Sequence, residues 1–193
     1  MVATLRRLTY LSVVALVLAL ATQAAAQAAR YAVPARGIFV VGQTLGGVGL
    51  GFTEAQVEAR WGSSYTVCNY AAYCKNGSTT WFFLTSRSGE PLGVGVRFVG
   101  GRAVAVFTLG AVGVTPVGST SAAANWKTSQ GLKMLDDPSQ IYTLYPAATI
   151  ATNCIFYNAL SMKTGNGVVS SFYLASGVIY GFALSAPGQP ICA

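Results

Sequence analysis

The sequence predicts an α+β fold of two tandem units, each a short helix packed on an antiparallel β-meander. Three observations predict this fold class. A capped short helix is encoded in residues 46–62 and again in residues 132–146. Each of these segments is followed by β-prone runs that alternate with turn residues. The two closing hairpins also align without a gap when Val99 is placed over Leu174.

Residues 1–28 have the features of a cleaved secretory signal peptide. Arg6 and Arg7 form a basic start, an apolar run follows over residues 8–21, and small residues around Ala26 offer cleavage positions. The apolar run is shorter than the ~20 residues that a membrane span needs, although an uncleaved anchor is the alternative. We therefore expect a secreted or extracytoplasmic protein with no integral membrane span after cleavage.

The mature chain is expected to divide into three parts. We place the first helix-plus-sheet repeat in residues 29–109, a connector in 110–130 and the second repeat in 131–193. The connector is rich in small and polar residues, which is typical of a linking segment. The alternative is a chance match, because capped helices and glycine hairpins are common.

The first predicted helix begins after Thr53. Its hydroxyl can cap the helix, and Gln56 stands three residues later to complete a capping box. Val57 and Trp61 are four residues apart and share one face. Gly62 can take the left-handed conformation that ends the helix.

The second predicted helix follows the same order with different residues. Asp137 is the expected cap and Pro138 the first helical residue. Ile141 and Tyr145 replace the buried pair of the first helix, and Pro146 ends the segment.

Strands are predicted after each helix. In the first unit, residues 79–85 are rich in aromatic and β-branched side chains, and apolar residues alternate over 94–98. Gly100 and Gly101 supply the positive φ angles of a two-residue hairpin turn, so the partner strand is expected at 102–109.

The second unit is expected to repeat this plan. We predict strands at 154–162, 168–174 and 178–185, with turns at 164–167 and 175–177.

The four cysteines, Cys68, Cys74, Cys154 and Cys192, all lie in the mature part. An even number in an exported chain indicates two disulfides, and three pairings are possible. We favour Cys68–Cys74 and Cys154–Cys192, because each bond then stays within one unit. A zinc site is the alternative, but the spacing is poor and the chain has no histidine, so we expect no metal.

The charge balance limits the possible partners. The chain has 12 basic and five acidic side chains, for a formal net charge of +7. The basic residues are scattered, which argues against a nucleic-acid partner. An anionic cell-surface ligand could be attracted at long range. The glycine clusters lack the lysine of a phosphate-binding loop, and we expect no cofactor.

The pattern Gly-x-Thr-x-x-Gln-Val-x-x-x-Trp-Gly at residues 51–62, followed by a cysteine loop and a β-meander, resembles the β-lactamase-inhibitor-protein fold. The pattern is also similar to that of small outer-membrane assembly lipoproteins, which are exported bacterial proteins with the same tandem helix-plus-sheet repeats. The resemblance implies two helix-plus-sheet units and a protein-binding role without catalysis. The known inhibitors use an acidic residue and aromatics on a projecting loop, where this chain offers Asn69, Tyr70 and Tyr73.

These three residues are the candidate ligand-binding residues. Asn69, Tyr70 and Tyr73 lie between Cys68 and Cys74, and a disulfide there would hold them in a compact loop. Tyrosine side chains are common in binding hot spots. The alternative is that the two tyrosines only cover nearby apolar surface.

The sequence gives little support for catalysis. Without histidine, the commonest general base is missing. The carboxylates are explained by helix positions or stand alone in a turn: Glu54, Glu58, Glu90, Asp136 and Asp137. We therefore predict a secreted or envelope-associated binding module that is not an enzyme, and the alternative is a secreted hydrolase of unrecognised type.

Overall fold

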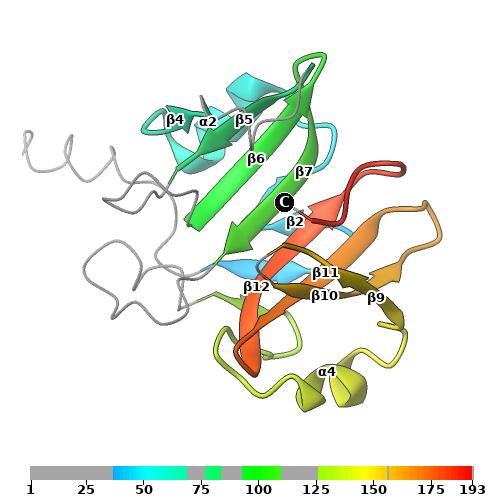
Figure 1. Cartoon of the computed structure of the whole chain (residues 1–193). Coiled ribbons are helices and arrows are strands. Elements are labelled where there is room, and N and C mark those ends of the chain that lie inside the picture. The colour runs from blue at the N-terminus through cyan, green and yellow to red at the C-terminus, as the bar shows by residue number, and fades with distance from the viewer. Residues whose placement is uncertain (1–36, 69–76, 84–92, 110–125, 156, 193) are drawn as a thin grey trace, which may run out of the picture. The chain divides into compact units, whose positions relative to one another are not determined.

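The computed structural model describes residues 37–68, 77–83, 93–109, 126–155 and 157–192, all within the compact unit Val33–Ala193. Within these residues the chain forms two β-sheets and two short helices (Figure 1).

The larger sheet has eight strands, all paired antiparallel. Its strands in spatial order are β4 (Thr66–Val67), β5 (Thr79–Phe82), β6 (Gly93–Val99), β7 (Arg102–Leu109), β12 (Val178–Ser185), β11 (Val169–Ala175), β10 (Asn158–Lys163) and β9 (Ile150–Asn153). Two four-strand meanders meet where β7 pairs with β12, and Thr108 lies opposite Phe182. Residues that are far apart in the sequence therefore share one continuous sheet.

The smaller sheet joins segments from both halves of the chain. Its order is β3 (Val48–Gly49), β2 (Thr44–Leu45), β1 (Ile38–Val40) and β8 (Lys127–Thr128). The β1–β8 pairing is parallel, with Ile38 opposite Lys127. This pairing ties the beginning of the described chain to the segment that precedes the second helix.

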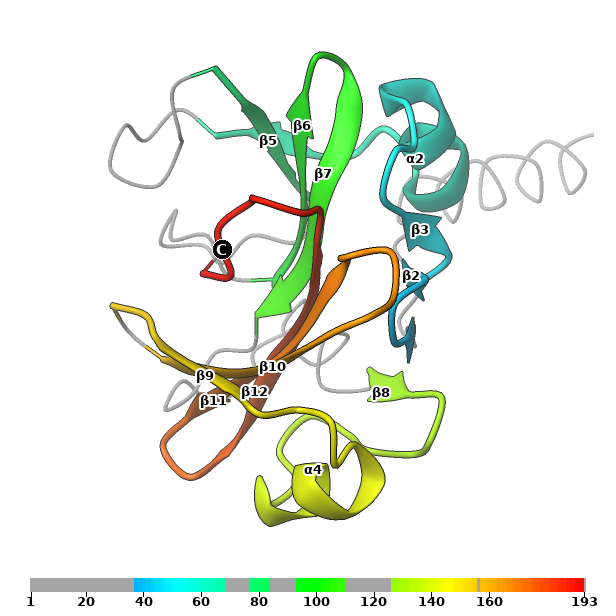
Figure 2. The same ribbon diagram turned by 90° about the vertical axis from the view of Figure 1, so that its right-hand side faces the viewer.

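The main hydrophobic core lies between the two sheets. Phe39 of β1 stacks on Phe182 of β12 at 5.4 Å between ring centroids and meets Phe172 of β11 edge-on at 6.0 Å. Trp126 and Trp61 are fully buried and meet edge-on at 6.1 Å. In Figure 2, β2, β3 and helix α2 (Glu54–Trp61) lie on one side of β6 and β7.

Helix α2 confirms the sequence-based expectation for its ends. The Thr53 hydroxyl accepts a hydrogen bond from the backbone N–H of Gln56, and the Gln56 side chain accepts one from the backbone N–H of Thr53. Val57 and Trp61 are buried, and the indole of Trp61 donates to the carbonyl oxygen of Gly46 at 2.9 Å. Gly62 ends the helix with a φ of 79°.

Helix α4 (Ser139–Leu144) is only six residues long. The structure places Pro138 at the N-cap, one residue later than predicted, and the Asp137 carboxylate accepts a hydrogen bond from the backbone N–H of Ser139 at 2.8 Å. Ile141 and Tyr145 are buried, and Tyr145 packs against Phe172 at 4.8 Å.

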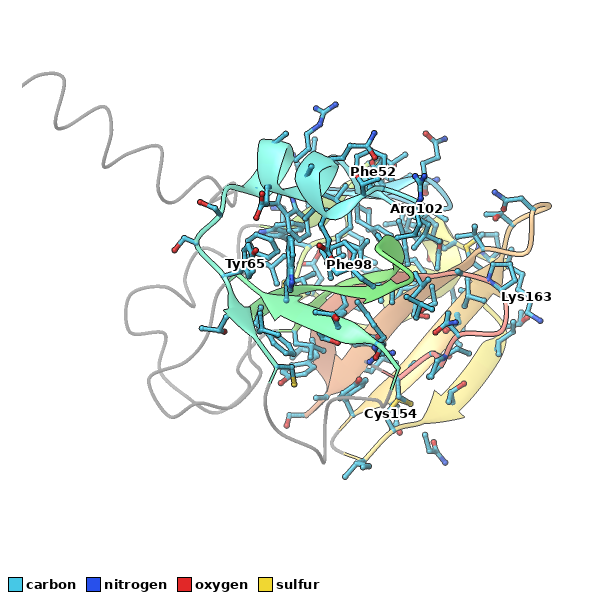
Figure 3. The ribbon with its side chains drawn as sticks, turned by 90° about the horizontal axis from the view of Figure 1, so that it is seen from above. Phe52, Tyr65, Phe98, Arg102, Cys154 and Lys163 are labelled. Atoms are coloured by element: carbon cyan, nitrogen blue, oxygen red, sulfur yellow. A yellow bond between two sulfur atoms is a disulfide. The ribbon has the colours of Figure 1, made fainter. Side chains whose placement is uncertain are left out.

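The second face of the large sheet carries a smaller cluster that includes Phe82, Phe107 and Tyr173. The C-terminal segment runs along this face, where the Tyr173 hydroxyl donates to the carbonyl oxygen of Ile191 at 2.7 Å. The predicted disulfide Cys154–Cys192 is confirmed, with the two Cα atoms 5.7 Å apart. Figure 3 shows Phe98 and Cys154 on opposite sides of the sheet, in agreement with the clusters they join.

The predicted α+β fold class is wrong. The described residues are mostly β, in sheets of four and eight strands with only two short helices, and they do not form a tandem of helix-on-meander units. The physical reason is the second sheet. Phe39, Leu45 and Trp126 are fully buried in and beside it, so strands and not helices supply much of the layer that covers the large sheet.

The predicted strand at 154–162 begins too early, because β10 spans Asn158–Lys163. Cys154 lies between β9 and β10, and its backbone N–H donates to the carbonyl oxygen of Tyr157 at 2.9 Å. By contrast, β7 and β12 have the predicted bounds. Strand β8 falls within the predicted connector, while the domain boundaries and the internal repeat stay predictions. The signal peptide over 1–28 lies outside the described residues.

Candidate functional site: an apolar surface beside helix α4

A pocket of about 460 Å³ opens where three elements meet: the beginning of α4, the β9–β10 loop and the β11–β12 turn. In both Figure 1 and Figure 2, α4 lies next to the β11–β12 hairpin. The pocket is lined by Pro138, Cys154, Ile155, Tyr157, Asn158, Leu174, Ala175, Ser176 and Gly177. None of these side chains carries a charge, so the pocket suits an apolar group with a few polar contacts.

The β11–β12 turn is shaped by two residues with positive φ. Ser176 has φ 51° and Gly177 has φ 78°, the conformation expected of the tight turns that join neighbouring antiparallel strands. The turn holds Leu174 opposite Ile179 and Ala175 opposite Val178. The pocket wall is therefore part of the rigid sheet and not of an isolated loop.

Leu135, which lies shortly before α4, has an unusual backbone conformation. Its φ is 72°, in the left-handed region, and its side chain is 59% exposed. The conformation is fixed by two hydrogen bonds to β12: Leu135 N–H donates to the Ile179 oxygen, and Ile179 N–H donates to the Asp136 oxygen, both at 2.9 Å. A bulky side chain at positive φ is a genuine outlier. The fold thus holds an apolar side chain in solvent at an energetic cost.

Ile155 is an exposed apolar residue that lines the pocket. Its side chain is 88% exposed although it lines the pocket. It directly follows Cys154, which is fixed by its disulfide to Cys192 and by its hydrogen bond to Tyr157. The loop therefore presents Ile155 from a covalently anchored position.

Tyr142 extends the apolar area along α4. Its side chain is 64% exposed, and it stands four residues after Pro138, so the two share one side of the helix. We call Leu135, Tyr142, Ile155 and the pocket together the α4 surface.

The charged groups beside the α4 surface have structural partners. Asp136 accepts a hydrogen bond from the backbone N–H of Lys133 at 2.8 Å. Hydrogen bonds from the Ser139 backbone and side chain lower the pKa of Asp137 below its ordinary value of 3.8. Asp137 is therefore ionised at neutral pH and stabilises the start of α4.

The ligand-binding residues predicted from sequence, Asn69, Tyr70 and Tyr73, lie outside the described residues, as does Cys74. Cys68 is disulfide-bonded, and its pairing with Cys74 stays a prediction. Leu135 and Ile155 were not predicted as site residues from the sequence. The Asp136–Asp137 pair next to Leu135 indicates a helix start, but it does not indicate the left-handed conformation of Leu135. Ile155 falls inside the strand predicted at 154–162.

None of the helices among the described residues is long and apolar enough to cross a membrane. No group of three or more metal-ligating side chains is found among the same residues.

Neither a protein-family model nor a curated protein matches this chain. Among solved structures, the chain is similar to the 1.5 Å crystal structure of an extracellular protein containing a SCP domain from Bacillus anthracis str. Ames. The TM-score is 0.44 and the sequence identity is 12%, over 71% of this chain and 44% of that chain. This chain therefore spans less than half of that protein's length.

Proposed function

We propose that this protein is an exported, non-catalytic binding module that captures a protein partner through the α4 surface. The observation that carries the proposal is Leu135, an exposed leucine held at positive φ by hydrogen bonds to Ile179. Strain of this kind clusters at binding and switch sites, where it is part of the function. In the free protein this leucine adds strain and covers little apolar surface.

The magnitudes favour a partner that covers the whole surface. A left-handed leucine costs roughly 1–2 kcal/mol, and fully burying a leucine or isoleucine side chain returns about 1.5–3 kcal/mol. The free energy gained by burying Leu135 and Ile155 together is thus comparable only to the lower end of the free-energy cost of association, which is about 4–15 kcal/mol. Tyr142 and the pocket must also be covered to give stable binding, and tyrosine is a frequent hot-spot residue.

Export and the absence of catalysis are supported by separate observations. The Cys154–Cys192 disulfide fits an oxidising compartment. The chain has no histidine, and three of its carboxylates, Glu58, Asp136 and Asp137, accept hydrogen bonds from groups in or beside their own elements. The net charge of +7 favours a second candidate ligand, an anionic polymer of the cell surface.

The test is quantitative capture from native culture supernatant and cell envelope with two variants. Leu135→Asn removes the apolar side chain but suits positive φ, because asparagine tolerates the left-handed region. We expect at least a tenfold loss of capture with an unchanged or higher melting midpoint. Val99→Asn is the matched control, because Val99 is an exposed apolar residue, 43% exposed, at a different hairpin.

Equal capture by wild type and Leu135→Asn would show that the α4 surface is not the binding site. If both variants retain capture and this capture disappears as the salt concentration is raised, the ligand is the anionic cell-surface polymer instead.

A further inference from the structure

Arg97 is buried on the second face of the large sheet. Its neighbours Val96 and Phe98 join the main core on the first face, and alternation places Arg97 on the other side. Its side chain is only 5% exposed, and within the described structure its Nε and Nη1 atoms have no hydrogen-bond partner. Two donors of a permanently charged group are thus buried and unused.

Thr80 shares this situation. It lies directly opposite Arg97 across the β5–β6 pair, is 3% exposed, and its hydroxyl has no hydrogen-bond partner. Directly opposed residues have Cβ atoms about 4.5–5.5 Å apart. The unused donors therefore come from neighbouring strands of a rigid sheet and can converge on one group.

A buried guanidinium needs a counter-ion. Arginine does not lose its proton in proteins, and charged residues are almost never fully buried unless they are paired. Burial lowers the pKa of Arg97, and the ionisable groups that interact with it are the tyrosines Tyr157 and Tyr173. Tyrosine is neutral at pH 7 and leaves the charge uncompensated.

The described carboxylates do not supply the counter-ion. Glu54 and Glu58 belong to α2, and Asp136 and Asp137 precede α4. None of these four accepts a hydrogen bond from the buried Nε or Nη1 of Arg97.

We propose that Arg97 and Thr80 form a binding site for the carboxylate group of an organic ligand. A carboxylate carries one negative charge, which matches that of the Arg97 guanidinium, and hydrogen bonds from an ionised donor to a carboxylate are stronger than those between neutral groups. The Thr80 hydroxyl supplies a further donor. This site goes beyond the proposed function, because it lies on the second sheet face and does not require the α4 surface.

The test measures the response of the full-length chain to acetate and benzoate, with chloride and inorganic phosphate at equal ionic strength as controls. We expect the melting midpoint to rise with the logarithm of carboxylate concentration once the site fills. The Arg97 Nε–H resonance should shift at the same concentrations. Arg97→Met should abolish the response, Thr80→Val should weaken carboxylate affinity at least tenfold, and Arg60→Met, which removes an exposed arginine, should change neither.

The ligand-free variants provide a second readout. Replacing an unpaired buried charge by an apolar side chain of similar length should leave the melting midpoint equal or higher. Glu90 is the one acidic side chain of the chain that lies outside the described residues. If Glu90→Gln and Arg97→Met both lower the midpoint and no carboxylate shifts the Arg97 resonance, then Arg97 has an internal partner and the proposal is wrong. An equal response to carboxylates and chloride, retained in Arg97→Met, would also overturn it.

Discussion

At the residue scale, the helix ends depend on single side-chain hydrogen bonds. Thr53 and Gln56 exchange two hydrogen bonds at the start of α2, and both were predictable because the spacing of a capping box is local. The left-handed conformation of Leu135 was not predictable. It follows from pairing with Ile179, more than 40 residues away in the chain, and the local sequence contains no turn signal for it.

The cap of α2 gives a direct stability prediction. Thr53→Ala removes the hydroxyl that accepts the Gln56 N–H and should lower the free energy of unfolding by about 1 kcal/mol. Thr53→Ser keeps the acceptor and is the control, with a change of only a few tenths of that value. Chemical denaturation of the three proteins measures the difference, and an unchanged Thr53→Ala value would mean that the cap contributes no stability.

At the element scale, regular strands were predictable and very short ones were not. Strands β7 and β12 each have eight residues with strong β-propensity and a glycine-containing turn before them, so their bounds follow from the sequence. Strands β2, β3 and β8 have two residues each, which is too short for alternation to be recognised. The parallel β1–β8 pairing also depends on contacts between segments that no local pattern connects.

The pairing of β7 with β12 can be tested at Gly181. A Cβ atom at this position would lie 2.0 Å from the backbone oxygen of Thr108, so the two central strands would have to separate. Gly181→Ala should therefore lower the free energy of unfolding by about 1–3 kcal/mol or more. Gly165→Ala is the control, because nothing lies within 4 Å of a Cβ there and it should be close to neutral.

A Gly181→Ala protein as stable as the control would contradict the close approach of β7 and β12. Equal amide exchange of the β7 residues in both variants would contradict it as well.

At the scale of the whole molecule, the sequence suggested two tandem helix-plus-sheet units, and the structure shows one continuous sheet covered in part by a second sheet. The four strands β4–β7 and the four strands β9–β12 merge into one sheet, and a second sheet built from distant segments covers part of its first face. Local patterns specify the meanders but not the edge at which they meet. The candidate site could not be predicted for the same reason, because the α4 surface combines a helix start, a loop and a hairpin turn.

The central claim is that the α4 surface contacts a protein partner, and site-specific photocrosslinking in the secreting cells tests it most directly. A photoreactive amino acid at position 155 should give a discrete protein adduct, because Ile155 is 88% exposed and lines the pocket. The same amino acid at position 99 should give none. An adduct of equal yield from position 99, or no adduct from position 155, would contradict the account.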